Sequence, residues 1–275
     1  MIDTRCDELI YESLANLLDV SNTKLKSYIM TNIQKYLNLD YYSICLEEFY
    51  DYFNISDNSF KIKSITIHHV TTRLNNVDKN SFTIDNLENV LLSKNPLTDL
   101  CADNEIIFKK EDGISIYHKN KKVDYEKLPP SLSRIKNRLK NLKDSCVNGF
   151  LFAEEMDHAY IGLTGMPEIF SDIMRSIDRQ DVQMQYFQNK KCYLVSIDVN
   201  VQDFIFDGEP NLNIYTKSNR ILKHLINYLC FKTNKNKSYL SFKNPMIRLP
   251  DNYNVMPKEI VEIRQIYDFK EIFCY

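Results

Sequence analysis

The stretch ITIHHVTTR, residues 65–73, sets two adjacent histidines beside threonine hydroxyls at the end of a run that alternates like a β-strand. In such a strand Ile67, His69 and Thr71 share one face, while His68 points to the other. The ring N–H of a histidine can donate to a ribose hydroxyl or a carbonyl, and a neighbouring threonine can fix its tautomer. His69 and Thr71 are therefore candidate ligand-binding residues. The alternative is a histidine whose hydrogen bonds serve the fold alone.

The elements that must position this strand mix helical and strand patterns without a regular βαβ rhythm. Residues 7–54 carry apolar residues at helical spacing, which predicts helices that pack on the main domain. From residue 59 the pattern changes to period two in FKIKSITIHHV, and helices and strands then follow in mixed order. We expect an α+β fold with an N-terminal helical subdomain at 1–58 and a main domain at 59–275.

Further elements are predicted along the main domain. Helices are expected in SFTIDNLENVLLSK, with Asp85 as N-cap, in SLSRIKNRLKNLKDS and in SNRILKHLINYLCF. A hairpin is expected to turn at Asp112 and Gly113. Strands are expected in VNGFLFAEE, KCYLVSIDVNVQDFIF, SYLSF and EIVEIRQIY.

The composition narrows the class of protein. A chain of 275 residues that is 44% hydrophobic can bury a full core, and a formal net charge of −2 gives no general basic field for nucleic acid. The seven cysteines lie far apart, without metal-ligand spacing, which is typical of reduced thiols in a cytosol. No apolar run approaches the ~18 residues of a membrane span. We expect a cytoplasmic protein with no membrane partner and no metal, from a bacterium or its phage.

The order of the segments resembles the ADP-ribosyltransferase-like fold, which bacterial toxins of the diphtheria-toxin type, poly-ADP-ribosyl enzymes and RNA 2′-phosphotransferases share. IHHVTT is similar to the first strand of that fold, where an H-[GA]-[ST] step receives the nicotinamide-side ribose of NAD. GFLFAEEMDHAYI looks like the second motif strand, CYLVSIDV like the central strand and YNVMPKEIVEIRQI like the closing element. The resemblance runs from about Ser59 to the C-terminus, and it implies a split mixed sheet and NAD as a substrate.

The resemblance also implies roles for residues. His69 would hold the NAD ribose, Thr71 would support it, and Tyr160 and Arg73 would be further NAD-binding residues, with the Tyr160 ring against nicotinamide. The second motif departs from the family pattern, because residues 151–153 read LFA where a Tyr or Ser is common.

A second departure concerns the catalytic carboxylate. The family's glutamate would fall near KNPMIRLP, which contains no acidic residue. The nearest substitutes are Asp251, Glu259 and Glu262, of which we take Glu262 as the candidate. A carboxylate at that point would stabilise the cationic ribose of the transition state.

These observations predict a protein that transfers ADP-ribose from NAD to a protein or nucleic-acid target, in a toxin, effector or phage-defence setting. The alternative is a catalytically silent domain of the same fold that binds a partner protein or nucleic acid. A third possibility, an enzyme acting on RNA 2′-phosphates, would need arginines near His69, and Arg73, Arg248 and Arg264 are available. The sequence does not indicate the oligomeric state.

Three charged stretches leave their roles open. RIKNRLKNLK and KTNKNKSYLSFK are either solvated surfaces or contacts to nucleic acid, the second with Tyr239 and Phe242 for stacking. FAEEMDH either binds a metal or places carboxylates at the positive end of a helix.

Overall fold

The computed structural model describes residues 1–37, 43–56, 60–142, 144–154, 164–206, 208–234 and 243–267. The helices in these ranges are α1 (Asp7–Leu18), α2 (Asn22–Leu37), α3 (Glu47–Phe53), α4 (Leu87–Leu92), α5 (Pro96–Asp103), α6 (Ser133–Ile135), α7 (Glu168–Ser176), α8 (Gln180–Asn189) and α9 (Ile214–Thr233). The strands are β1 (Ser64–Arg73), β2 (Ile106–Glu111), β3 (Gly113–His118), β4 (Lys121–Lys122), β5 (Asn148–Phe150), β6 (Lys191–Asn200), β7 (Ile205–Phe206), β8 (Met246–Arg248) and β9 (Ile260–Ile266). The fold is α+β, as the sequence predicts.

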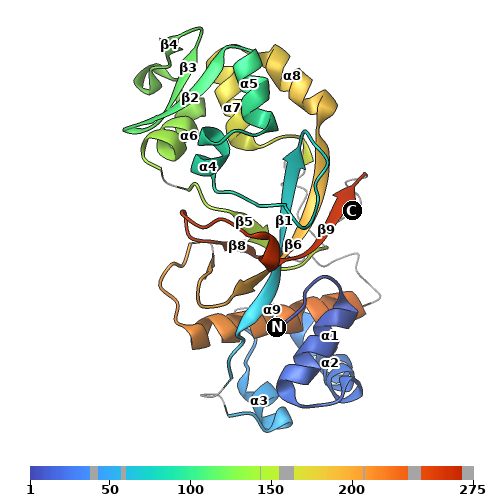
Figure 1. Ribbon diagram of the computed structural model, residues 1–275. Helices are drawn as coiled ribbons and strands as arrows, with labels where there is room; N and C mark the ends of the chain where they lie inside the picture. Colours follow the sequence, from blue (N-terminus) through green and yellow to red (C-terminus); the bar gives the residue numbers. More distant parts are fainter. Residues whose placement is uncertain are drawn as a thin grey trace.

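A six-stranded sheet with the order β7-β8-β5-β1-β6-β9 forms the centre of the molecule (Figure 1). Each pair of named strands in it is antiparallel, so the expectation of a mixed sheet is wrong for these strands. The one parallel pairing found among the described residues is an isolated bridge between Ile2 and Ile65, through which the N-terminal segment lies beside the start of β1. A single bridge adds too little to form a parallel strand.

The sheet is divided between β1 and β5. β1 pairs with β6 over ten positions, from Ser64 to Arg73, whereas it pairs with β5 at one position only, His68 opposite Phe150. The two halves of the sheet, β7-β8-β5 and β1-β6-β9, are thus joined at a narrow point. We call the region around this point the split.

Helices α1, α2 and α9 pack together on one face of the sheet, below it in Figure 1. Their apolar stripes share one core with the sheet, in which Leu14, Ile29, Leu225 and Ile197 are fully buried. Burial of one such side chain contributes roughly 1.5–3 kcal/mol. The predicted packing of the N-terminal helices on the main domain is confirmed.

The elements α4 to α8 and β2 to β4 form an upper lobe in Figure 1. The lobe has a hydrophobic core of its own, to which Ile116, Ile135 and Ile173 belong. The side chain of Tyr186 in α8 ties it to the sheet, because the Tyr186 hydroxyl lies 2.7 Å from Thr72 Oγ1 near the end of β1. The cores therefore group residues 1–56 with the sheet and set the upper lobe apart.

Several local predictions need correction. The N-cap of α4 is Asn86, whose side chain accepts from the Asn89 N–H, and not Asp85. The helix predicted across 131–145 is irregular, because a π-helical turn follows Ile135. The predicted strand SYLSF lies outside the described residues. The hairpin at Asp112 is confirmed, and Gly113 adopts a φ of +89° there.

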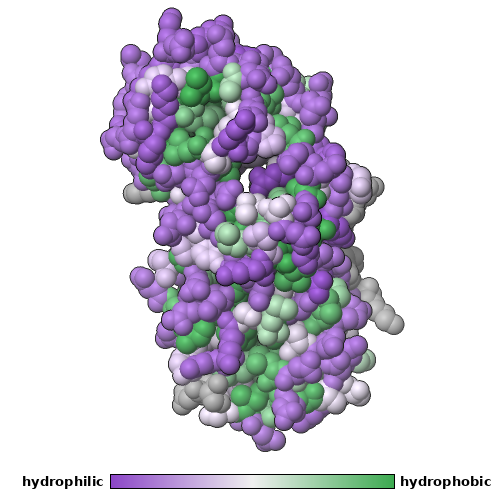
Figure 2. All heavy atoms as spheres, viewed as in Figure 1, coloured by the Kyte–Doolittle hydropathy of each residue, from purple (hydrophilic) through white to green (hydrophobic). Residues whose placement is uncertain are grey.

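The surface is mostly hydrophilic in the view of Figure 2, with hydrophobic residues gathered in separate patches on the upper lobe and over the lower helices. Within the described ranges, no helix is both long enough and apolar enough to cross a membrane.

Candidate functional site

His69 lies at the split. Its Nδ1 is 2.6 Å from the backbone oxygen of Asn148 in β5, and since a carbonyl only accepts, Nδ1 carries the proton. The imidazole therefore bridges the strands where their pairing ends. Burial lowers the pKa of His69 to about 4, so the ring is neutral at pH 7 and its Nε2 is an acceptor. In the part of the chain that the structure describes, no residue hydrogen-bonds to this Nε2.

His68 occupies the opposite face and is fully buried. The Thr4 hydroxyl donates to the Thr66 carbonyl at 2.6 Å, so its oxygen accepts from His68 Nε2 at 2.9 Å. His68 Nδ1 is then the acceptor for the Ser196 hydroxyl at 3.0 Å. Both ring nitrogens are satisfied inside the protein, and burial lowers the pKa of His68 to about 3. His68 therefore has no ring nitrogen that is free to bind a ligand directly.

The predicted alternation of the two histidines is thus confirmed, and each ring is fixed as a different tautomer. His69 is the Nδ1–H form and His68 the Nε2–H form. One correction follows for His69. Its ring N–H donates to Asn148 and not toward a ligand, so its free Nε2 can only accept, for example from a ribose hydroxyl.

Thr71 and Arg73 follow His69 on the same face of β1, at intervals of two residues. Thr71 is buried, whereas Arg73 is half-buried with its guanidinium carbon 5.2 Å from the centre of the Phe82 ring. The guanidinium forms one long hydrogen bond to the described residues, 3.4 Å to the carbonyl of Thr83. No carboxylate of the described residues forms an ion pair with it. Burial lowers the pKa of Arg73, but an arginine keeps its charge. The structure brings these three candidates to one face.

Glu262 lies on the other face. In the ladder between β6 and β9 it stands opposite Ser196, whereas His69 stands opposite Val195, the preceding residue of β6. Successive residues of a strand point to opposite faces, so Glu262 shares the face of His68. The single site that joins His69, Thr71 and Glu262 is therefore not formed.

The other candidate carboxylates serve local structure. Asp251 accepts from the Ser145 N–H at 3.1 Å. Glu259 accepts from the Met256 N–H at 2.8 Å and from the Tyr253 hydroxyl. Neither carboxylate hydrogen-bonds to His69.

The arginines do not converge on His69 either. Arg73 is on its face of the sheet, but Arg264 stands opposite Leu194 and so faces the other way. Arg248 forms an ion pair with Asp144 at 3.1 Å. The predicted NAD-binding residue Tyr160 lies outside the described residues, as do the stretches EMDHA and SYLSF. Among the described residues, no group of three or more His, Cys, Asp and Glu side chains is placed to hold a metal ion.

A cavity of about 290 Å³ lies on the Glu262 face of the sheet. It is lined by the start of α1, the segment after β5 and the strands β6 and β9, through Arg5, Cys6, Leu9, Ala153, Glu154, Leu194, Ser196, Glu262 and Arg264. Arg5 is held by Asp3 at 2.6 Å, and Glu154 by Lys232 at 2.7 Å. The sequence pattern does not indicate this cavity or the hydrogen bonds beside it, because Thr4 and Ser196 are isolated small polar residues that only the fold brings to His68.

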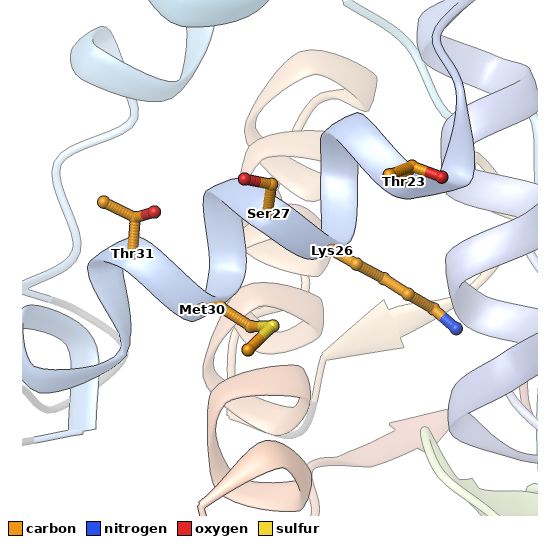
Figure 3. A pocket seen from close by; sticks show the side chains of 5 residues that line it. All are labelled: Thr23, Lys26, Ser27, Met30 and Thr31. Carbon is orange, nitrogen blue, oxygen red and sulfur yellow. The ribbon is translucent and has the colours of Figure 1, made fainter.

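A second hollow, of about 470 Å³, runs along α2 (Figure 3). Its lining residues, Thr23, Lys26, Ser27, Met30 and Thr31, all come from the exposed side of that one helix. Because one helix supplies all of these residues and only one of them is charged, the groove lacks the convergent polar groups that catalysis requires.

No protein-family model, no curated protein and no solved structure matches the chain.

Proposed function

We propose that the chain binds NAD at the split and transfers ADP-ribose from it to a protein or nucleic-acid target. The observation that carries the proposal is His69, whose ring is fixed across the split by Asn148 and whose Nε2 is left without a partner among the described residues. An acceptor held in place at the split suits a ribose hydroxyl, which can donate to it. Because the ring is already held, binding loses little side-chain entropy.

Arg73 and Thr71 support the same site. A guanidinium without a carboxylate partner, on the same face as His69, suits the diphosphate of NAD, since arginine binds phosphate through two parallel N–H donors. Alternate residues on one face of a strand are about 7 Å apart, so His69 and Arg73 are separated by roughly 13 Å. That spacing fits contacts to a ribose and to a phosphate of one extended nucleotide.

The setting proposed is the cytoplasm of a bacterium, in a toxin, effector or phage-defence role. The six cysteines in the described ranges are free thiols, in agreement with a reducing compartment. The macromolecular target is not specified by these residues.

The test is nicotinamide release. The purified chain is incubated with millimolar NAD, with and without a bacterial lysate that supplies acceptors, and nicotinamide is measured by chromatography. The proposal predicts release by the wild type and a loss of ~100-fold in His69→Ala, the scale on which one preorganised polar contact acts in catalysis. Circular dichroism checks that the variant is folded.

A second candidate function, binding of a partner protein or nucleic acid without transfer, is favoured by one observation. Glu262 lies on the opposite face from His69, and Asp251 and Glu259 are bonded elsewhere. Without a carboxylate the cationic ribose loses a large electrostatic stabilisation. In this case millimolar NAD leaves the melting temperature unchanged, because only a bound ligand raises it by mass action, and no nicotinamide is released.

A further inference from the structure

The cavity on the Glu262 face has a nucleophile in its wall. Ser196 is only 3% exposed, yet its side chain lines the cavity together with Leu194 of the same strand. The Ser196 hydroxyl is also the end of the hydrogen-bonded chain that runs through His68 to Thr4. A serine on an imidazole, at the wall of a cavity, is the arrangement from which serine nucleophiles act.

The directions of the hydrogen bonds that link Thr4, His68 and Ser196 can be assigned in only one way. The Thr4 hydroxyl has one proton, which goes to the Thr66 carbonyl. His68 must then donate from Nε2 to Thr4, and Ser196 must donate to His68 Nδ1. The hydroxyl proton of Ser196 is directed at His68, which can act as a base. The lone pairs of Ser196 Oγ take no part in this series of hydrogen bonds. Thr4 thus fixes the tautomer of His68, the task that a third residue performs in a nucleophile–base pair.

A cationic side chain lies near Ser196, where it can stabilise the negative charge that forms when a serine attacks a carbonyl. Arg264 in β9 lies on the same face as Ser196, in the neighbouring strand and two residues from the position directly opposite. Diagonal neighbours of this kind have side-chain origins about 7–8 Å apart, within the reach of an arginine. Arg264 lines the cavity, and its guanidinium has no hydrogen bond or ion pair with any described residue.

We propose that Ser196 is a nucleophile that attacks small carboxylic esters in this cavity. Ser196 Oγ forms a bond to the ester carbonyl carbon, and its proton moves to His68 Nδ1. Arg264 stabilises the oxyanion of the tetrahedral intermediate. The ester C–O bond then breaks, the alcohol leaves with the proton from His68, and water releases the acid from Ser196 in a second round.

The lining residues define the substrate class. The apolar side chains of Leu9, Ala153 and Leu194 suit a short acyl chain, and a volume of about 290 Å³ admits only a small molecule. Burial lowers the pKa of His68 to about 3, so the base is free at neutral pH but weak. Turnover of esters is therefore expected to be slow. A reactive electrophile that bonds covalently to the serine is the most sensitive way to detect the nucleophile. The inference is independent of NAD binding, which involves the other face of the sheet.

The test is covalent labelling of the full chain with diisopropyl fluorophosphate. Ser196 Oγ would bond to phosphorus while fluoride leaves, so the intact mass rises by one diisopropylphosphoryl group, which peptide mapping places on Ser196. We expect Ser196→Ala to remain unlabelled and Ser93→Ala, a change at an exposed serine, to be labelled like the wild type. If the wild type stays unmodified while a serine protease in parallel is fully modified, or if the label is on another serine, the proposal is overturned.

A second variant guards against misfolding of Ser196→Ala, which leaves His68 Nδ1 without a donor. Arg264→Gln removes the cation but leaves the hydrogen bonds among Thr4, His68 and Ser196 in place, so the fold is retained. Labelling should slow by about 100-fold, the scale of losing one oxyanion donor. Labelling of Arg264→Gln at the wild-type rate would show that Arg264 does not stabilise the oxyanion, and would overturn the proposed mechanism.

Discussion

His69 and Glu262 lie on opposite faces of the same sheet, because His69 stands opposite Val195 in β6 and Glu262 stands opposite Ser196, the next residue. The histidine that could receive NAD and the carboxylate that could drive transfer are thus separated by the sheet itself. A rotation of one side chain cannot bring them together. Binding and chemistry at the split are therefore distinct questions, to be tested by separate measurements.

The two adjacent histidines should be opposite tautomers in solution. His68 donates from Nε2 to Thr4, whereas His69 donates from Nδ1 to the Asn148 carbonyl. Nitrogen-15 chemical shifts, read from two-bond couplings to the ring protons, distinguish the forms directly. We expect both patterns to persist at pH 6, since the pKa values of His68 and His69 are lowered to about 3 and about 4. The same tautomer at both residues would contradict the hydrogen bonding described here.

Stability should fall in mild acid. The pKa of a histidine in the unfolded chain is about 6.5. Burial lowers the folded-state pKa of His68 and His224 to about 3 and that of His69 to about 4. Above pH 6.5 these rings are neutral in both states, but as the pH falls below it the unfolded state takes up protons that the folded state does not.

The resulting loss is at most about 1.4 kcal/mol per pH unit for each histidine. Urea unfolding at pH 7.5 and pH 5.0 measures it, and His68→Gln should show a smaller difference between the two midpoints. Equal midpoints of the wild type at both pH values would contradict the burial of these rings.

The packing of α1 on the sheet and α9 can be tested with a matched pair of leucines. Leu14 is fully buried, whereas Leu17 in the same helix is 41% exposed. Leu14→Ala should lower the free energy of unfolding by about 2–5 kcal/mol, the range for a large core side chain, and Leu17→Ala by much less. Chemical denaturation gives both values. Similar small effects at the two sites would mean that the N-terminal helices are not part of the core.

Two glycines with left-handed backbones allow a second matched comparison. Gly113 has a φ of +89°, and a Cβ there would lie 2.5 Å from the Leu139 carbonyl oxygen. Gly208 has a φ of +82°, and apart from its neighbours in the chain no atom of the described residues lies within 4 Å of that position. Gly208→Ala should cost only the backbone strain, about 1–2 kcal/mol, whereas Gly113→Ala adds a clash with rigid backbone and should cost more. Thermal melting compares the two, and an equal loss would argue against the close approach of residues 139–140 to the hairpin.

The sequence predicts most helices and strands correctly, but it does not predict which residues come together in a site. Period two in ITIHHVTTR correctly separated His68 from His69, because the side chains of a strand alternate whatever surrounds it. The start of α4 was placed one residue early, since Asp85 and Asn86 are both good caps and only the contacts of the fold decide between them.

Relations between distant segments could not be predicted. No sequence pattern relates Glu262 to His69, because the face that Glu262 occupies depends on the register of β9 against β6. The contacts of Thr4 and Ser196 with His68 join residues 64 and 128 positions apart. Such contacts need the three-dimensional pairing of β1 with β6 and with the N-terminal segment.

The most direct test of the central claim is the affinity of the chain for NAD, measured by isothermal titration calorimetry on the wild type, His69→Ala and Glu262→Gln. We expect the wild type to bind and His69→Ala to bind at least about tenfold more weakly, through the loss of one buried hydrogen bond. Glu262→Gln should bind as the wild type does. A wild type that does not bind millimolar NAD, or a loss of affinity in Glu262→Gln with none in His69→Ala, would contradict a NAD site at the split.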